Sequence, residues 1–507
     1  MSKNTFTKDL TGTYISQFAT AVFGVLSLKI IAGVFSEEQF GAFLIAKRIG
    51  QIGFAIVTMN LGMSLAKYIP QKKYESNNWL LLTFTSFFIL FIFVFLLSFI
   101  FKNQLSKIFF GDSQYSFLFI SAIIYLFSYS IQNISSNYWR GNSKFKIMNL
   151  INPTFHLFSI IVMLLFALFN VTTNNIFAYY FIVYSALIIG FNIIILIVNV
   201  KNKFSIKETF NFFLKSKTEI KNYLYYGISR LPSGFFYSAI FFLPIFLAQN
   251  YYSLTVAAHI GIIISVANLF MLFGIPFNLL FLPRFSNYKF FTNDEYIRNR
   301  SQDIINFIFS VPFLLSAFLF LFSNEIIFLW FGEKYISVGH YLMSFSPAIG
   351  FFISFVIIRS VLDGLENFPY SNIITIMSLF TMVFVILLLI VLNSFGMLGL
   401  TIAFGSSLAM LGVSSIYFLK IKTGVVLFNK QNIFAMSWFF IVFILFLIFN
   451  TIIKIDSLIS LVFVKILISI LIIFLTFFIY RKLNYFWLDN IIAKIKLIII
   501  KNQLLKK

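Results

Sequence analysis

Long apolar runs constrain the fold of this chain more than any other feature of its sequence. The stretch WLLLTFTSFFILFIFVFLLSFIF, residues 79–101, contains no acidic and no basic residue. A helix of about twenty apolar residues can cross the hydrocarbon core of a bilayer, which is about 30 Å thick. Strands are not expected, because an open sheet edge cannot satisfy its backbone in lipid and the alternating pattern of a barrel does not occur.

Fourteen such runs follow one another along the chain. We predict membrane spans at 11–34, 40–66, 79–101, 116–139, 149–170, 176–200, 224–249, 255–283, 302–322, 341–359, 371–392, 396–419, 432–450 and 457–480. Charged residues make up only 11% of the 507 positions, whereas soluble domains contain about 25%. The sequence therefore predicts an all-α polytopic membrane protein with about 14 transmembrane helices.

Residues that bind metals or form disulfides are scarce. The chain has no cysteine, which excludes disulfides and thiolate metal sites. Its 3 histidines, His156, His259 and His340, lie too far apart in the sequence to show a metal-ligand spacing. We expect no cofactor.

The distribution of basic residues predicts the orientation of the chain. With the N-terminus inside, the outer loops contain only Lys102, Lys107, Lys334 and Lys454 of the 38 Lys and Arg residues. Because basic loops stay on the cytoplasmic side, both termini are predicted to be cytoplasmic, in a multi-pass protein of the cell (inner) membrane. The net charge of +22 is explained by this topology and by anionic membrane lipids, so a nucleic-acid partner is not expected.

Two matching pairs of segments indicate an internal repeat. IFFGDSQYSFLF (108–119) resembles LWFGEKYISVGHYL (329–342), and YWRGNSKFKIMNLIN (138–152) resembles VLDGLENFPYSNIIT (361–375), with nearly the same displacement along the chain. Each repeat has six spans, so both enter the membrane in the same direction. We predict two six-helix lobes related by a pseudo-twofold axis along the membrane normal, with the substrate site between them.

These patterns divide the chain into five parts. The predicted N-lobe occupies 1–200 with spans one to six, and the predicted C-lobe occupies 224–422 with spans seven to twelve. Two further spans lie within 423–480. The linker 201–223 and the tail 481–507 interleave lysines with aromatic and aliphatic residues, a pattern typical of amphipathic segments at a membrane surface.

Several motifs resemble those of a transporter family. Residues 35–62, FSEEQFGAFLIAKRIGQIGFAIVTMNLG, resemble the first-loop and second-span signature of polysaccharide flippases. That signature consists of an acidic pair, an aromatic residue, a glycine and a helix that ends in glycine. Three further segments fall where second-lobe motifs of that family lie: YLYYGISRLPSGFF (223–236), FLPRFS (281–286) and FGEKYISVGHYL (331–342). The chain is similar to O-antigen-type flippases of the multidrug/oligosaccharidyl-lipid/polysaccharide exporter superfamily.

The resemblance implies a V-shaped transporter, not an enzyme, that works by alternating access. Its cargo would be a polyprenyl-pyrophosphate-linked oligosaccharide, moved from the cytoplasmic to the outer leaflet for cell-surface polysaccharide biosynthesis. A glycan polymerase or glycosyltransferases are candidate partners. Two alternatives stay open: a flippase for a peptidoglycan precursor, and an exporter of drugs or other small molecules from the same superfamily. A membrane-embedded glycosyltransferase is less favoured, because the chain has no large soluble loop.

The charges within the predicted spans favour an anionic cargo. Lys29, Lys47, Arg48, Arg230 and Lys465 lie within spans, whereas the 16 acidic residues fall in loops, interfacial segments or helix ends. A cation-coupled drug exporter is expected to have a titratable carboxylate inside a span. Arginine suits a pyrophosphate, because its guanidinium forms paired hydrogen bonds with phosphate oxygens.

Lys47 and Arg48 are the principal candidates for cargo binding. They lie about 11 Å inside the predicted outer end of span two at a rise of 1.5 Å per residue, which is far for their side chains to reach the interface. Arg48 shares a helical face with Gln51, and Gln17 lies on a similar face of span one. The two faces comprise Arg48, Gln51, Ala55, Thr58 and Gly62 in span two and Thr13, Gln17, Thr20, Gly24 and Ser27 in span one. We predict that they border a water-filled cavity; the alternative is that they pack helix against helix.

Lys29 and Arg230 are further candidates. Lys29 lies near the outer end of span one, and Lys465 lies in span fourteen, so each side chain can instead extend to the interface or meet a lipid. Arg230 precedes Pro232, where the helix is predicted to break, and its side chain can instead bind carbonyl groups that the break frees.

Overall fold

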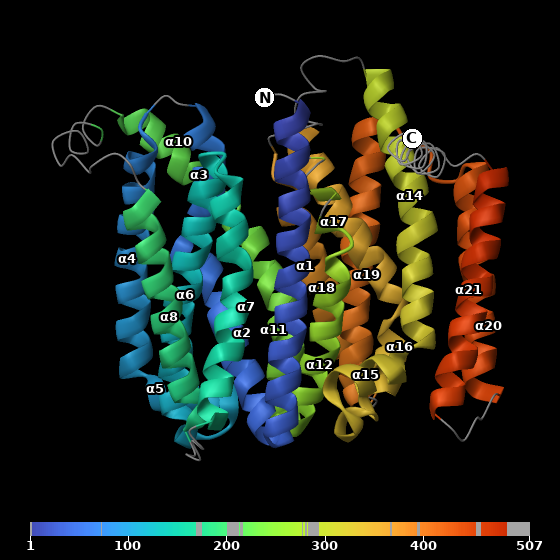
Figure 1. Cartoon of the computed structure of the whole chain (residues 1–507), viewed down its shortest axis with the longest axis horizontal. Coiled ribbons are helices and arrows are strands. Elements are labelled where there is room, and N and C mark those ends of the chain that lie inside the picture. Colours follow the sequence, from blue (N-terminus) through green and yellow to red (C-terminus); the bar gives the residue numbers. More distant parts are fainter. Residues whose placement is uncertain are drawn as a thin grey trace, which may run out of the picture.

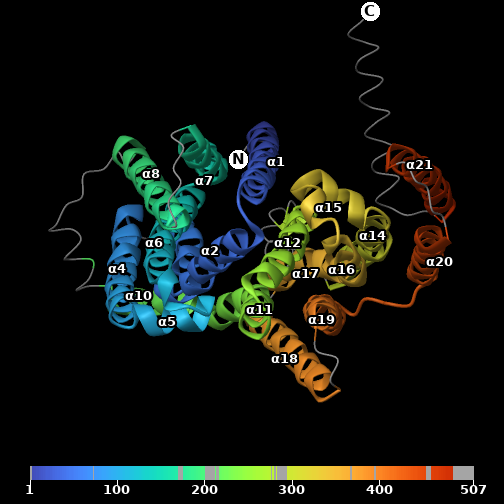
Figure 2. The same cartoon turned by 90° about the horizontal axis from the view of Figure 1, so that it is seen from below.

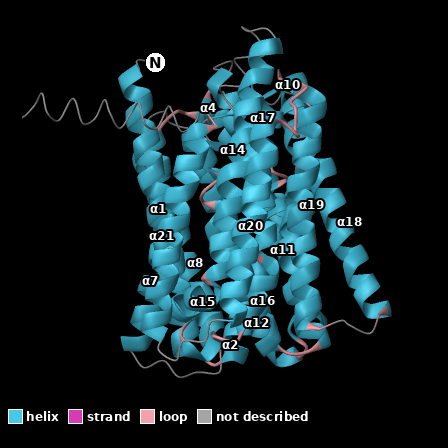
Figure 3. Cartoon of the chain, turned by 90° about the vertical axis from the view of Figure 1, so that its right-hand side faces the viewer, coloured by secondary structure: helices cyan, strands magenta, loops and turns pink. Residues whose placement is uncertain are grey.

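Helices make up almost all of the described structure. The computed structural model of this chain describes residues 3–71, 74–168, 175–199, 212, 216–275, 277–278, 281, 294–365, 368–392, 396–452 and 458–483. Within these residues no strand occurs, and 14 helices are long and apolar enough to cross a membrane. The axes of most of the long helices are roughly parallel to one another (Figure 3). The predicted fold class, an all-α polytopic membrane protein, is confirmed.

The helices lie in two groups, followed by a C-terminal pair (Figures 1 and 2). The first group contains α1 (Lys3–Val34), α2 (Glu37–Thr58), α3 (Leu61–Tyr68), α4 (Ser76–Ile100), α5 (Lys102–Phe110), α6 (Ser116–Gly141), α7 (Phe145–Leu168) and α8 (Ile176–Asn199). The second group contains α11 (Leu231–Tyr251), α12 (Leu254–Met271), α14 (Asp294–Leu321), α15 (Ser323–Phe331), α16 (Val338–Phe345), α17 (Pro347–Leu365), α18 (Tyr370–Val391) and α19 (Met397–Thr423). The pair consists of α20 (Lys430–Ile452) and α21 (Leu458–Lys482). In Figure 1 the N-terminus lies at the top, and we name this the N-terminal end of the bundle and the opposite one the far end.

The predicted repeat recurs at the far end of both groups. The helices α5 and α15 have 9 residues each, and each ends at a glycine with positive φ, 84° at Gly111 and 93° at Gly332. Glycine is favoured there because a Cβ atom disfavours positive φ. A 3-10 helix follows each glycine, Ser113–Tyr115 in the first group and Glu333–Tyr335 in the second. Because both copies lie at the same end (Figure 1), the two groups cross in the same direction.

The second predicted span is divided into two helices. Ser36 and Gln39 form a capping box at the start of α2, in which each side chain accepts a hydrogen bond from the other residue's backbone N–H. The helix ends at Met59 and Asn60, whose φ angles of 47° and 52° lie in the left-handed region. The predicted span 40–66 therefore becomes α2 followed by α3.

The helix break predicted before Pro232 separates α10 (Lys217–Ile228) from α11. Pro232 lies in the first turn of α11, where a missing N–H removes no helical hydrogen bond. Two amides bind the carbonyl groups at the break: Asn60 Nδ2 donates to Arg230 O and Asn372 Nδ2 donates to Ser229 O, both at 2.8 Å. The chain therefore satisfies its own backbone at a break inside the bundle.

The helix α10 lies beside α3 and α4 of the first group (Figure 1). Its Tyr223 is buried and stacks on Trp79 with a centroid distance of 4.7 Å. The Ser64 hydroxyl donates to Tyr223 O at 3.0 Å. The predicted domain limit at 223/224 falls inside α10. The break at Ser229 and Arg230 instead separates α10, which packs on the first group, from α11, which belongs to the second group.

Other predicted limits shift or lie outside the described residues. The tenth span is α17, Pro347–Leu365, instead of 341–359, because the chain forms the separate short helix α16 before Pro347. Residues 201–211 and 484–507 contain most of the predicted surface segments and lie outside the described part of the chain.

A buried ion pair connects α21 to the second group. Lys465 Nζ lies 2.8 Å from Glu325 Oε1 and donates to Leu321 O at 2.7 Å, and both charged side chains are almost completely buried. The prediction that Lys465 extends to the interface or meets a lipid is wrong. Glu325 does lie at a helix end, in the first turn of α15, but inside the protein.

The absence of cysteine allows the orientation to be tested with single cysteines. Gln114 lies in the 3-10 helix that follows α5 at the far end, Lys430 is the first residue of α20 at the opposite end, and both are exposed. We expect a membrane-impermeant maleimide to label Gln114→Cys in intact cells and Lys430→Cys only after permeabilisation. Labelling of both in intact cells would show that the predicted orientation or the span count between them is wrong.

Removing the Lys465 charge should destabilise the protein strongly. The change Lys465→Met leaves Glu325 buried without a counter-charge, which costs about 3–5 kcal/mol when one partner of a buried pair is lost. We expect a lower unfolding temperature in detergent for Lys465→Met, and recovery of most of it in Glu325→Gln/Lys465→Met. Equal unfolding temperatures for wild type and Lys465→Met would contradict the role of the pair.

Candidate functional site

A cavity of about 620 Å³ lies between the two helix groups. The first group contributes residues of α1, α2, α6 and α7, and the second contributes residues of α11, α12, α15 and α17. Its polar lining consists of Gln17, Thr20, Lys47, Arg48, Gln51, Asn60, Tyr129, Gln132, Asn133, Ser136, Asn152, His156, Tyr237, Ser238, Ser265, Asn268 and Arg359. Cavities of this size are typical of sites for small molecules or parts of larger ligands.

The formal charges of the cavity wall are all positive. Lys47 and Arg48 come from α2 of the first group, and Arg359 comes from α17 of the second. None of the described residues that line the cavity is Asp or Glu. Two groups of helices thus present cations to one space without a carboxylate in its wall.

Arg48 lies in the cavity as predicted and is oriented by its neighbour Gln51. Its Nη1 donates to Gln51 Oε1 at 2.7 Å, and its guanidinium carbon lies 6.0 Å from the ring centroid of Phe241 on α11. A guanidinium has five N–H donors, and within the described residues we find no other hydrogen bond or ion pair of this side chain. Most donors of Arg48 therefore remain available to a ligand.

Lys47 has no ion-pair or hydrogen-bond partner for its ammonium within the described part of the chain. It lines the cavity and also a small adjoining pocket in the first group, together with His156 and Tyr184. The fold thus places two adjacent cations of one apolar span beside the same cavity.

The polar face of α1 is divided between the cavity and the packing of α1 on α7. Gln17, Thr20 and Gly24 line the cavity. Thr13 accepts a hydrogen bond from Asn149 Nδ2 at 3.3 Å, which joins α1 to α7. Ser27 donates to Gly24 O within α1. On α2, Gln51 and Ala55 line the cavity, whereas Thr58 at the end of α2 and Gly62 in α3 are buried outside it.

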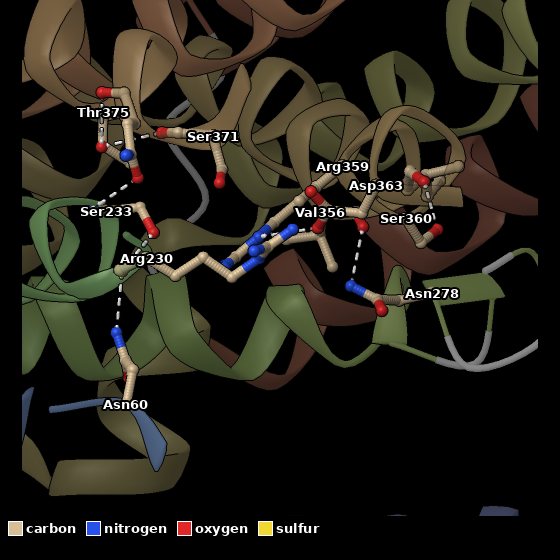
Figure 4. A network of polar contacts seen from close by, with 12 residues as sticks. Asn60, Arg230, Ser233, Asn278, Val356, Arg359, Ser360, Asp363, Ser371 and Thr375 are labelled. Atoms are coloured by element: carbon tan, nitrogen blue, oxygen red, sulfur yellow. Dashed lines mark hydrogen bonds and ion pairs between the residues drawn. The ribbon is translucent and has the colours of Figure 1, made fainter. Parts of the chain in front are cut away.

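Arg359 is a cavity residue that the sequence analysis missed. Its Nε lies 3.7 Å from Asp363 Oδ2 one turn further along α17. Figure 4 shows the side chains of Arg359 and Arg230 extending toward one another beside Asp363. The predicted span ends at residue 359, which places Arg359 at the edge of an inner loop. The spacing of Arg359 and Asp363, four residues apart on a helix, was the available signal.

Lys29 and Arg230 do not line the cavity. Lys29 is exposed near the far end and donates to Leu329 O at 3.0 Å, so we do not retain it as a cargo-binding residue. Arg230 is buried, and its guanidinium carbon lies 3.8 Å from the ring centroid of Tyr226. Its side chain makes a long hydrogen bond of 3.5 Å to Tyr226 O, while Asn60 and Asn372 bind the carbonyl groups at the break.

The two groups contact each other at the far end of the cavity. Trp330 Nε1, from α15, donates to Val25 O of α1 at 2.9 Å. His259 Nε2 of α12 lies 3.2 Å from Glu37 Oε2 of α2. In the same region Lys334 Nζ donates to Phe35 O at 3.1 Å. These contacts must break if the far ends of the groups separate.

Solved structures with a similar arrangement of helices are transporters. One is described as "Lipid II flippase MurJ, inward closed conformation", with a TM-score of 0.65 and 15% identity over 93% of this chain and 99% of that chain. The chain has the fold of these transporters. A second is a structure of the MATE multidrug transporter DinF-BH, with a TM-score of 0.63 and 13% identity over 85% of this chain and 98% of that chain.

A third structure extends the comparison to a named superfamily. It is an inward-facing multidrug resistance MATE family transporter of the MOP superfamily, with a TM-score of 0.57 and 14% identity over 84% of this chain and 95% of that chain. No family model and no curated protein sequence matches the chain. The comparisons support a multi-pass membrane protein with a transporter fold, and none of these three structures is described as an enzyme.

Weakening the far-end contacts should open the cavity toward the outside. We expect Thr20→Cys, a reporter in the cavity wall, to react about 5-fold to 30-fold faster with an impermeant maleimide in a Glu37→Gln/Trp330→Phe background, since each of the two weakened contacts contributes up to about 1 kcal/mol. His340→Ala is the matched control, because His340 is exposed in the same region. Equal labelling rates in both backgrounds would show that these contacts do not hold the far end closed.

Proposed function

We propose that the protein is a flippase that moves a polyprenyl-pyrophosphate-linked oligosaccharide from the cytoplasmic to the outer leaflet by alternating access. The observation that carries this proposal is the cavity wall with Lys47, Arg48 and Arg359 and no carboxylate among its described residues. Fixed positive charge on both sides of one space suits a cargo with two phosphates, because each helix group can bind the same diphosphate.

The cationic wall lowers the free-energy cost of moving such a cargo through the membrane. A diphosphate cannot cross bare hydrocarbon, because removing its hydration costs many kcal/mol. Guanidinium and ammonium groups replace part of that hydration, and polar neighbours such as Gln17 and Asn268 add further hydrogen-bonding groups. The sugars and the diphosphate would occupy the cavity while the polyprenyl chain stays in lipid.

The membrane potential can favour movement in the proposed direction. One charge that crosses the full field gains about 2.3 kcal/mol per 100 mV. A cargo with two negative charges that leaves an inside-negative cytoplasm would therefore gain roughly 4–5 kcal/mol. The proposed orientation, with the N-terminal end cytoplasmic, rests on the basic inner loops.

A drug exporter fits the cavity less well. The fold is shared with MATE exporters, but a cationic drug would meet only positive formal charges among the described residues of this wall. A peptidoglycan-precursor flippase shares the same cargo chemistry, a lipid-linked diphosphate, and differs in the sugars. Testing both glycans on the purified protein separates these two flippase functions.

Neutralising the cavity arginine should impair flipping without affecting insertion. Hydrogen bonds to charged groups contribute about 1.5–3 kcal/mol, so Arg48→Gln should lower the flipping rate about tenfold to hundredfold in proteoliposomes with lipid-linked oligosaccharide. Lys47→Ala/Arg48→Gln should be slower still. Arg48→Lys should retain part of the activity, because it keeps the charge but loses the paired donors.

Arg298→Gln is the matched control for this experiment, because Arg298 is an exposed arginine at the N-terminal end and outside the cavity. It should flip at the wild-type rate. Full activity in a normally inserted Lys47→Ala/Arg48→Gln protein, or transport of a cationic drug in place of the lipid-linked cargo, would overturn the proposed function.

A further inference from the structure

A second group of cations lies outside the cavity, around the ring of Tyr226 on α10. Lys67 Nζ of α3 lies 4.0 Å from the ring centroid, and the guanidinium carbon of Arg230 lies 3.8 Å from it. The same ring therefore contacts a cation of α3 and a cation at the break between α10 and α11. Tyr226 thus joins two cations that would otherwise repel each other.

A third cation lies close enough to interact electrostatically with the same tyrosine. Arg140, in the last turn of α6, interacts electrostatically with Tyr226. Within the described residues, the side chains of Lys67 and Arg140 have no ion pair and no hydrogen bond. Burial and then the charge of Arg230 lower the pKa of the Lys67 ammonium. The cluster therefore holds more positive charge than its surroundings neutralise.

Two carboxylates lie near the cluster, fewer than its three cations. Asp363 interacts with Tyr226 and Arg230, but it already pairs with Arg359 at 3.7 Å. Glu219 lies two turns before Tyr226 on α10 and interacts with Tyr68. Two cations against one ring and a third nearby outnumber these two carboxylates, one of which already pairs with Arg359, so the cluster is suited to an anion.

The cluster is continuous with the cavity. Lys67 is exposed at the N-terminal end, Arg230 is buried against the ring of Tyr226, and Arg230 and Arg359 extend toward one another (Figure 4). Arg359 is itself part of the cavity wall. A row of cations therefore leads from the surface at the N-terminal end, through the helix break at Arg230, to the space that holds Arg48.

We propose that Lys67, Arg140 and Arg230 around Tyr226 form a phosphate-binding entrance site that receives the diphosphate of the cargo before it reaches the cavity. This rests on the proposed flippase function. Lys67 binds the phosphate groups at the surface, the partly buried Arg140 supports this binding, and Arg230 passes the phosphates to Arg359 as the lobes rearrange. The helix break places Arg230 at the turning point of this path.

Transport kinetics separate the entrance from the cavity. In proteoliposomes with lipid-linked oligosaccharide, Lys67→Gln/Arg140→Gln should raise the KM about tenfold, because charge-assisted contacts to phosphate are lost at the first binding step. The kcat should stay within about twofold of wild type. Arg48→Gln should instead lower kcat. Tyr226→Phe keeps the ring and should behave as wild type, and Lys67→Arg/Arg140→Lys should restore the KM.

Lys144→Gln is the matched control. Lys144 is an exposed cation at the same end, four residues after Arg140, and its Nζ lies 4.8 Å from the ring centroid of Trp139. Its loss removes one positive charge from the same end of the bundle but leaves the Tyr226 cluster intact, so the KM should not change. An equal rise in KM for Lys144→Gln would show a general surface-charge effect and overturn the site.

Direct binding identifies the source of the phosphate. The full chain in phosphatidylcholine nanodiscs is titrated with a short-chain prenyl diphosphate, and the double variant should bind it about tenfold more weakly than wild type. Equal affinities together with an equal KM would overturn the entrance site. An effect that appears only in phosphatidylglycerol nanodiscs would assign the cluster to phospholipid headgroups and overturn its role for cargo. Weakened diphosphate binding in a protein that flips no lipid-linked glycan would support the site and refute the proposed function.

Discussion

Positive charge held inside the protein beside a cavity whose described lining contains no carboxylate is the constraint on which the rest of the structure depends. An ionised side chain at the centre of a membrane costs from about 3 kcal/mol upward, and Lys47, Arg48 and Arg359 remain in a wall whose described residues include no Asp or Glu. Such charges are tolerable only where water or an anionic ligand replaces lost hydration. The cavity between the helix groups provides that space, and the polar faces of α1 and α2 give it a wettable wall.

The buried ion pair of Lys465 and Glu325 shows the opposite solution to the same cost. There a lysine inside the protein is neutralised at 2.8 Å by a carboxylate and binds a backbone carbonyl as well. It holds α21 to the second group and leaves no charge for a ligand. The contrast between this pair and the cations of the cavity wall separates a structural use of buried charge from the ligand-binding use that we propose.

Much of the fold follows from local sequence rules. Apolar run length predicts the fourteen spans, Pro232 predicts the break before α11, and the paired glycines Gly111 and Gly332 predict a repeat that the structure shows as matching short helices. Periodicity on α2 and α1 also predicts that Arg48, Gln51 and Gln17 share a wall. These features depend on neighbours along one helix, so sequence spacing is sufficient to find them.

The remaining features of the site depend on contacts between segments that lie far apart in the sequence. The spacing of residues along one helix does not predict such contacts. Arg359 enters the cavity because the tenth span begins at Pro347, and an error of a few residues at that boundary places it in a loop instead. Lys465 could not be assigned a partner, because Glu325 lies 140 residues away in sequence. Lys29 and Lys47 are both lysines within predicted spans, but Lys29 is exposed near the far end, whereas Lys47 lines the cavity.

The central claim is that cations of both helix groups bind one diphosphate in the cavity. A structure of the protein with a lipid-linked diphosphate oligosaccharide in nanodiscs tests this most directly. We expect density for the two phosphates between Arg48 of α2 and Arg359 of α17, with the sugars in the same cavity. Phosphates bound elsewhere, with the cavity cations free of ligand in a protein that transports this cargo, would contradict the account.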